Sequence, residues 1–180
     1  MGVRRTLVVL AIGILLVSGC SAESSNSSER VSAESSTAAA ATPSVASENQ
    51  VASIVARYEP QMREVVEAAG SCRSVWVLGD RSDPLVGADA YICYTSEQTA
   101  AINASLLSAE LAEILPPESM TNLVERTSVV LDAIAAIDLP DVCGTESFPN
   151  DTEECTAAVG SLYGLYRQLD AQLNAWGPYL

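Results

Sequence analysis

Apolar residues recur at helical spacing in four long segments of this chain, and this pattern restricts its fold more than any other feature. The segments span residues 51–69, 89–115, 120–137 and 150–176. In each segment the apolar side chains fall three or four positions apart, which places them on one face of an α-helix. Prolines or glycines follow all four segments, and both residue types end helices. The sequence therefore predicts an all-α fold, a four-helix up-down bundle with short connections.

The ends and the shape of these helices are also predicted. Pro60 interrupts the first segment, but the apolar stripe keeps its phase across the proline, so we expect one kinked helix. Gly70 is expected to end that helix, and Pro140 to end the third. Polar and acidic residues at 150–154 favour a helix start there.

The segment from residue 72 to residue 93 does not fit the helical pattern. Residues 74–78 are β-like, but a single strand has no partner in a chain without other strand patterns. We expect residues 72–93 to form a packed loop or a short extra helix, held at both ends by a disulfide.

The first twenty residues have the organisation of an export signal. Arg4 and Arg5 precede an uncharged apolar run at residues 7–17, which is shorter than the roughly 20 residues of a membrane-spanning helix. The run leads into VSGC at residues 17–20, which closely resembles the lipobox of bacterial lipoprotein precursors. The resemblance covers residues 1–20 only. It implies that Cys20 is lipidated, that residues 1–19 are removed, and that the lipid holds the chain on the extracytoplasmic face of the cell membrane. The alternative is an ordinary secretory signal, and the arginine pair leaves a twin-arginine export route open.

The remaining chain divides into a tether and one domain. Residues 20–49 consist of the lipidated cysteine and a Ser- and Ala-rich stretch that buries too little apolar surface to fold, so we expect a flexible tether. Residues 50–180 are long enough for one helical-bundle domain with a single core.

Four cysteines follow Cys20 and are expected to form two disulfides, because an even number in an exported domain implies a disulfide framework. Four cysteines allow three pairings. We favour Cys72–Cys93 and Cys143–Cys155, because short loops close more readily than long ones. No Cys-x-x-Cys pair is present, so the cysteines do not resemble a zinc site.

Composition excludes several classes of function. Removal of residues 1–19 leaves seven Arg against 23 acidic residues, a net charge of about −16. This charge argues against nucleic acid as a partner and against direct binding to anionic lipids. The chain has no His and no Lys, so Ser has no base of either type to activate it. We therefore expect no enzyme activity, no cofactor and no metal site.

Three groups of residues are candidate sites, and each also has a structural explanation. Asp80, Asp83 and Asp89, with Ser82, lack the order of a calcium loop and are expected to be solvated loop acids. Asp151, Glu153 and Glu154 are explained by their place at a helix start. The pairs Tyr91–Tyr94 and Tyr163–Tyr166 each share a helix face, where they either line a pocket or a partner-facing patch, or pack in the core.

Three functions are compatible with these features. The first is a non-catalytic binding or interaction module at the cell envelope, whose partner is an envelope protein or a cell-wall component. The second is a carrier of a small apolar ligand within the bundle, with room left by the small side chains of Ala100, Ala101, Ala104 and Ala109. The third, ranked below these two, is a carboxylate-based hydrolase, which requires two inward-facing acids in a cleft.

Overall fold

The domain is all-α, as predicted. The computed structural model describes residues 44–144, 148–150 and 152–180. Four long helices and one short helix account for most of them, and within these residues there is no strand, only an isolated bridge between Val45 and Leu115. The helices are α1 (Glu48–Leu78), α2 (Pro84–Ala112), α3 (Glu118–Ala135), α4 (Leu139–Cys143) and α5 (Glu153–Trp176).

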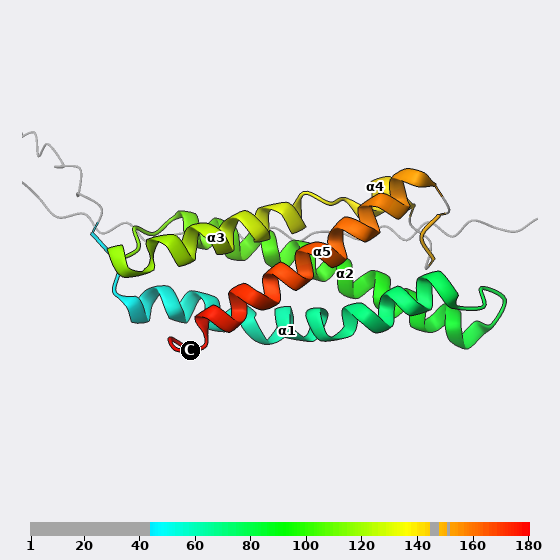
Figure 1. The fold of residues 1–180 in the computed structure, drawn as a ribbon, viewed down its shortest axis with the longest axis horizontal. Coiled ribbons are helices and arrows are strands. Elements are labelled where there is room, and N and C mark those ends of the chain that lie inside the picture. Colours follow the sequence, from blue (N-terminus) through cyan, green and yellow to red (C-terminus); the bar gives the residue numbers. More distant parts are fainter. Residues whose placement is uncertain (1–43, 145–147, 151) are drawn as a thin grey trace, which may run out of the picture. The chain divides into compact units, whose positions relative to one another are not determined.

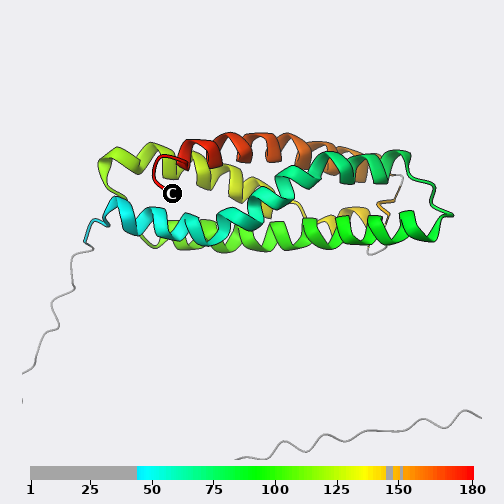
Figure 2. The ribbon, with the colours of Figure 1, turned by 90° about the horizontal axis from the view of Figure 1, so that it is seen from below.

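The long helices lie side by side as a bundle (Figures 1 and 2). α1 packs on α2, α2 on α3, α3 on α5, and α5 on α1, while the short α4 packs on α5. The apolar stripes of all four long helices meet in one core, whose largest fully buried side chains include Trp176, Tyr166, Met62 and Leu107. The segments that form α1, α3 and α5 therefore bury the faces that their spacing predicts. In α2 the expected stripe was only partly correct, because Leu107 and Leu111 are buried but Ile102 and Leu106 are 61% and 50% exposed.

α1 crosses Pro60 without interruption, as predicted, and its ribbon bends along its length (Figure 2). It begins at Glu48, close to the expected start of the domain. Ser47 caps it through a reciprocal arrangement in which the Gln50 backbone N–H donates to Ser47 Oγ (3.3 Å) and the Ser47 N–H donates to Gln50 Oε1 (2.7 Å).

The prediction that Gly70 ends the first helix is wrong. α1 continues for two more turns to Leu78 and buries Cys72 and Trp76 on the same stripe. A glycine inside a helix costs only about 1 kcal/mol, which is less than the burial of a tryptophan contributes. The indole N–H of Trp76 also donates to the carbonyl of Ala90 on α2 (3.3 Å).

Residues 72–93 are therefore two helix ends and a tight turn, not a packed loop or a separate helix. α2 begins at Pro84, five residues before the expected Asp89. The turn at residues 79–83 has no room for a side chain at its first position, because a Cβ on Gly79 would lie 2.6 Å from Val86 Cγ1. The glycine lets α1 and α2 meet closely at this end of the bundle.

The third helix ends at Ala135, earlier than the predicted stop at Pro140. Pro140 lies instead in the first turn of α4, where a missing backbone N–H costs nothing. α5 begins and ends as predicted, with Thr152 as its N-cap and Gly177 after its last residue; Asp151 lies outside the described residues.

Both favoured disulfides are present. Cys72–Cys93 joins α1 to α2 with a Cα–Cα distance of 5.4 Å, and Cys143–Cys155 joins α4 to α5 at 4.8 Å. All four cysteines are buried. Each disulfide closes a connection between helices that are neighbours in the chain, and such a cross-link stabilises a fold by about 3 kcal/mol.

Candidate functional site

A cavity of about 470 Å³ opens on the side of the bundle between α2 and the segment that joins α3 to α4. Its volume is within the range of about 300–1,000 Å³ that is typical of small-molecule sites. Most of its walls are apolar: Ala101, Ile102, Ala135, Ile137, Leu139 and Pro140. Its polar lining comes from Glu97, Gln98, Ser105 and Asp138. We call it the Glu97 cavity.

Glu97 is the most unusual residue of the site, because its side chain is an acid on the buried face of α2. It is only 3% exposed. The hydroxyl of Tyr166 on α5 donates to Glu97 Oε2. Within the described part of the chain, Oε1 has no hydrogen-bond partner. Oε1 is not fully buried, because the fully buried polar atoms without a partner among the described residues are the Tyr163 hydroxyl and Gln172 Oε1. Burial of most of an acidic side chain is nevertheless costly.

Burial changes the protonation of this acid. Removal of the carboxyl from water raises the pKa of Glu97 from its ordinary value of 4.5 to about 7, and the Tyr166 hydrogen bond offsets only part of that rise. Near neutral pH the group therefore changes charge in response to small changes in its surroundings. Such a group in an apolar cavity marks a candidate site.

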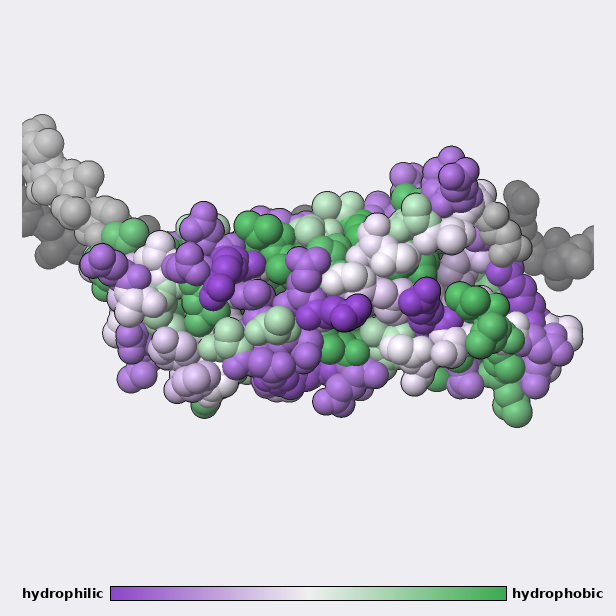
Figure 3. Space-filling view, viewed as in Figure 1, coloured by the Kyte–Doolittle hydropathy of each residue, from purple (hydrophilic) through white to green (hydrophobic). Residues whose placement is uncertain are grey.

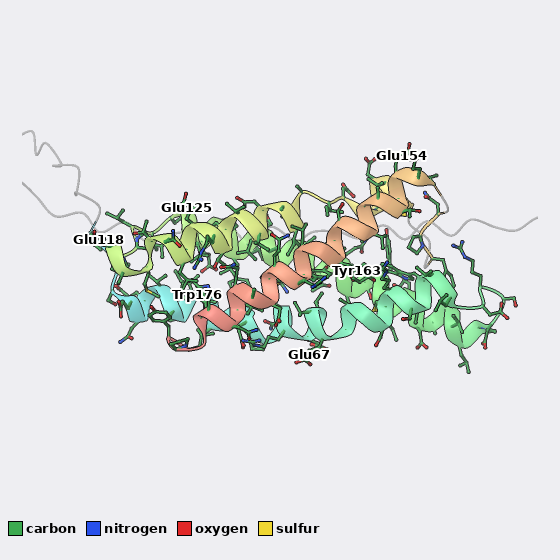
Figure 4. All side chains as sticks on the ribbon, viewed as in Figure 1. Glu67, Glu118, Glu125, Glu154, Tyr163 and Trp176 are labelled. Carbon is green, nitrogen blue, oxygen red and sulfur yellow. A yellow bond between two sulfur atoms is a disulfide. The ribbon has the colours of Figure 1, made fainter. Side chains whose placement is uncertain are left out.

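Tyr166, the partner of Glu97, also lines a second hollow, whose charged lining residues are Arg73, Arg167 and Asp170. Tyr163 lines the same hollow, which has a volume of about 480 Å³ and lies between α1 and α5. Tyr163 projects from α5 toward α1 (Figure 4), and the Arg73 guanidinium lies 5.7 Å from the centre of its ring. The Tyr163 hydroxyl is buried and has no hydrogen-bond partner among the described residues.

The two predicted tyrosine pairs differ in how far their side chains are buried. Tyr163 and Tyr166 come together in the core, with ring centres 6.5 Å apart, and Tyr166 belongs to the site. In the other pair, Tyr91 is 58% exposed, whereas Tyr94 is buried and donates to the carbonyl of Gly144 (2.8 Å). Tyr163 and Tyr166 therefore line the hollow between α1 and α5, and Tyr166 also contacts Glu97, whereas Tyr94 holds Gly144 at the end of α4.

The four alanines of α2 that were expected to leave room for a ligand also differ in their burial. Ala100 and Ala104 are fully packed in the core, Ala101 lines the Glu97 cavity, and Ala109 is exposed. Only Ala101 therefore contributes to a space that a ligand can enter.

Two of the acidic candidates, Asp80 and Asp83, have structural roles, and Asp89 is an exposed residue of α2. Asp80 Oδ1 accepts from the N–H of Ser82 (2.9 Å) and closes the turn, while Asp83 caps α2 by accepting from the N–H of Leu85 (2.9 Å). Glu153 and Glu154 are exposed in the first turn of α5. Within residues 44–144, 148–150 and 152–180, no group of three or more acids or cysteines is arranged to hold a metal ion. Cys20 and Asp151 lie outside these residues.

A second candidate site is a group of exposed apolar side chains at one end of the bundle. Val77, Leu78 and Leu85 are 67%, 82% and 76% exposed at the end of the bundle where α1 turns into α2. Figure 3 shows hydrophobic side chains gathered there, at the lower right. We call these three residues the apolar tip. The Cys72–Cys93 disulfide holds the helices that carry them.

Sequence reasoning missed Glu97, although its signal was present. The buried stripe of α2 runs through Ala90, Cys93, Ala100 and Ala104, and Glu97 falls in the same register. An acid on an apolar stripe is a buried-charge candidate from the sequence alone.

In comparisons with known proteins, this chain matches no family model, no curated protein and no solved structure. Among the helices of the described residues, none combines the length and the apolar character that crossing a membrane requires.

Proposed function

We propose that this chain is a lipid-anchored, extracytoplasmic helical protein that acts as a non-catalytic binding module at the cell envelope. The anchor is the lipid on Cys20, and the binding site is the Glu97 cavity. The observation that supports this function is an apolar cavity of ligand size with one buried acid at its wall. The partner bound there is a small molecule, which enters from the side of the bundle.

The arrangement of the acids favours binding over hydrolysis. A carboxylate-based hydrolase needs two carboxyl groups that face one substrate. Glu97 and Asp138 both line the cavity, but Asp138 is exposed and its Oδ1 accepts from the N–H of Asp141 (3.1 Å) at the start of α4. Asp138 thus serves as a helix cap, which leaves Glu97 as the inward-facing acid.

A carrier that opens its bundle around a ligand has less support. Such a carrier needs free space between the helices, and the small residues Ala100 and Ala104 are 1% and 0% exposed in close packing. We also infer that the four long helices alternate in direction, in an up-down order. Helices that follow one another in the chain are packing neighbours, and the α1–α2 connection is short.

The apolar tip supports a second candidate function, the docking of an envelope protein. Three large apolar side chains, each more than 60% exposed and close together in the chain, are unusual on a monomer surface. In this function the bundle holds the tip at the end away from residue 44, where the described chain begins (Figure 1).

Native mass spectrometry of the mature chain, gently purified from membranes, tests the binding function. We expect an extra mass that is lost on denaturation, whereas the covalent lipid stays. Ala101→Phe fills the cavity and is expected to abolish that mass. Ala109→Phe adds the same ring to an exposed position of α2 and serves as the matched control. A bare wild-type mass, or a bound mass that survives in Ala101→Phe, would contradict a ligand in the Glu97 cavity.

Replacement of Cys20 tests the anchor. Cys20→Ala is expected to remove all incorporation of labelled fatty acid and to release the exported chain from the membrane fraction, because the lipid is the proposed attachment. The control is the double variant Cys143→Ala with Cys155→Ala, which removes two other cysteines and is expected to leave the lipid in place. An exported Cys20→Ala chain that still carries acyl groups would show that the anchor is elsewhere.

A further inference from the structure

The Glu97 cavity combines two chemical environments that a single ligand can satisfy. Its walls include the apolar side chains of Ile102, Ile137 and Leu139. Its one deeply buried polar group is the carboxyl of Glu97. A ligand that fills this space therefore needs an apolar body and one polar head that reaches an acid.

The hydrogen bonds of Glu97 specify what the head must be. Tyr166 donates to Oε2 and holds the carboxyl group, while Oε1 has no partner within the described residues. An ionised carboxylate only accepts hydrogen bonds. The accessible Oε1 can therefore accept a hydrogen bond from a ligand, and a donor with positive charge gives the strongest such bond.

The charges around the cavity favour a cation in the same way. Glu97 and Asp138 are its charged lining residues, and no arginine lines it. Arg73 and Arg167 line the other hollow, together with Tyr166 and Asp170. Since the chain contains no lysine, it supplies no ammonium of its own to the carboxylate.

We propose that the Glu97 cavity binds a small amphipathic amine, with its ammonium group on Glu97 and its apolar part along Ile102, Ile137 and Leu139. This inference rests on the proposed binding function and names its ligand class. Tyr166 acts as a positioning residue, because its hydroxyl holds Oε2 and leaves Oε1 directed to the ligand's donor.

The protonation of Glu97 couples this binding to pH. The pKa of Glu97 is about 7, and an ammonium beside the carboxylate favours its charged form. The other titratable groups that face it are Tyr163 and Tyr166 from α5, Arg73 from α1 beyond Tyr163, and Asp138 at the cavity rim. An alkylamine stays protonated up to a pH of about 10, so the affinity is expected to rise about tenfold between about pH 6 and pH 8, as Glu97 ionises.

Three probes with one tail and different heads test the proposal: octylamine, octanol and octanoate. The protein is the full exported chain with Cys20→Ala, purified without detergent so that no acyl chain competes for the cavity. Isothermal titration calorimetry at about pH 8 is expected to give octylamine an affinity at least about tenfold above that of octanol, and no binding of octanoate. Glu97→Gln is expected to lower the octylamine affinity to that of octanol, to remove its pH dependence, and to leave octanol binding unchanged.

The controls separate this inference from the proposed function. Glu125→Gln removes the same charge from an exposed position of α3 and is expected to leave all three affinities unchanged, which excludes general attraction to an acidic protein. Equal binding of octanol and octylamine, or octylamine binding that persists in Glu97→Gln, would overturn the amine but keep an apolar binding cavity. Failure of all three probes to bind would overturn both.

Discussion

Replacement of Trp176 with alanine is expected to lower the free energy of unfolding by about 4 kcal/mol. The tryptophan near the end of α5 is fully buried (0% exposed) and lies edge-on to Tyr179, with ring centres 6.1 Å apart. Truncation of a buried tryptophan removes its transfer free energy and leaves a cavity, which together typically cost about 3–5 kcal/mol. Urea unfolding of the oxidised chain, followed by far-UV circular dichroism, measures the change.

The partner of Trp176 separates lost volume from a lost hydrogen bond. The indole N–H donates to Thr127 Oγ1 (2.9 Å), and the same hydroxyl donates to the carbonyl of Leu123 (2.8 Å). Thr127→Val keeps the volume but leaves the indole N–H unpaired, so it is expected to cost about 2 kcal/mol. A loss below about 1 kcal/mol for Trp176→Ala would show that the C-terminal end of α5 does not contribute to the core.

The apolar spacing was sufficient to predict the four long helices, although in α2 it did not identify the buried face correctly, because Ile102 and Leu106 are exposed. In α5, Cys155, Leu162, Tyr166, Leu169 and Leu173 recur at helical spacing and are all buried. The disulfide pairing was also accessible, because the favoured partners are near in sequence and each pair spans one connection. These features depend on local order along the chain.

The errors arose where tertiary contacts outweigh local preference. Gly70 has a weak preference against the helix, but Cys72 and Trp76 beyond it bury against α2 and keep α1 helical to Leu78. The β-like residues 74–78 are helical for the same reason. A single sequence does not reveal the partner helix that decides such a segment.

The candidate site was less predictable than the fold. Glu97 stands on a buried stripe and was detectable as an anomaly, but its partner Tyr166 lies 69 positions away. The cavity joins α2 to residues 135–140, whose path depends on the end of α3 at Ala135. That end carries no glycine or proline signal at Ala135 itself, so spacing alone did not reveal it.

Glu97→Gln is expected to stabilise the domain by about 3 kcal/mol near pH 8 and to change its stability little near pH 4. In the unfolded chain the carboxyl ionises around its ordinary pKa of 4.5, whereas in the folded domain its pKa is about 7. As the pH rises between these values, the unfolded state loses the proton and the folded state keeps it, so the folded state becomes relatively less stable. Above the folded-state pKa the penalty is constant, about 1.4 kcal/mol for each pKa unit. Glutamine has a similar shape and no charge to bury, so it removes the penalty.

The difference in unfolding free energy between wild type and Glu97→Gln, measured in urea at a series of pH values, isolates this one group. Other carboxylates also titrate, but they do so in both proteins and cancel in the difference. Glu125→Gln, at an exposed position, is expected to stay within about 0.5 kcal/mol of wild type. A gap that is constant with pH would mean that Glu97 is not desolvated, and a wild type that is more stable near pH 8 would mean that its carboxylate already has a cationic partner. We expect octylamine to reduce the difference in unfolding free energy between wild type and Glu97→Gln near pH 8. That result would show that the carboxylate that destabilises the domain is also the group that binds the amine, because a ligand that binds only the folded state stabilises it.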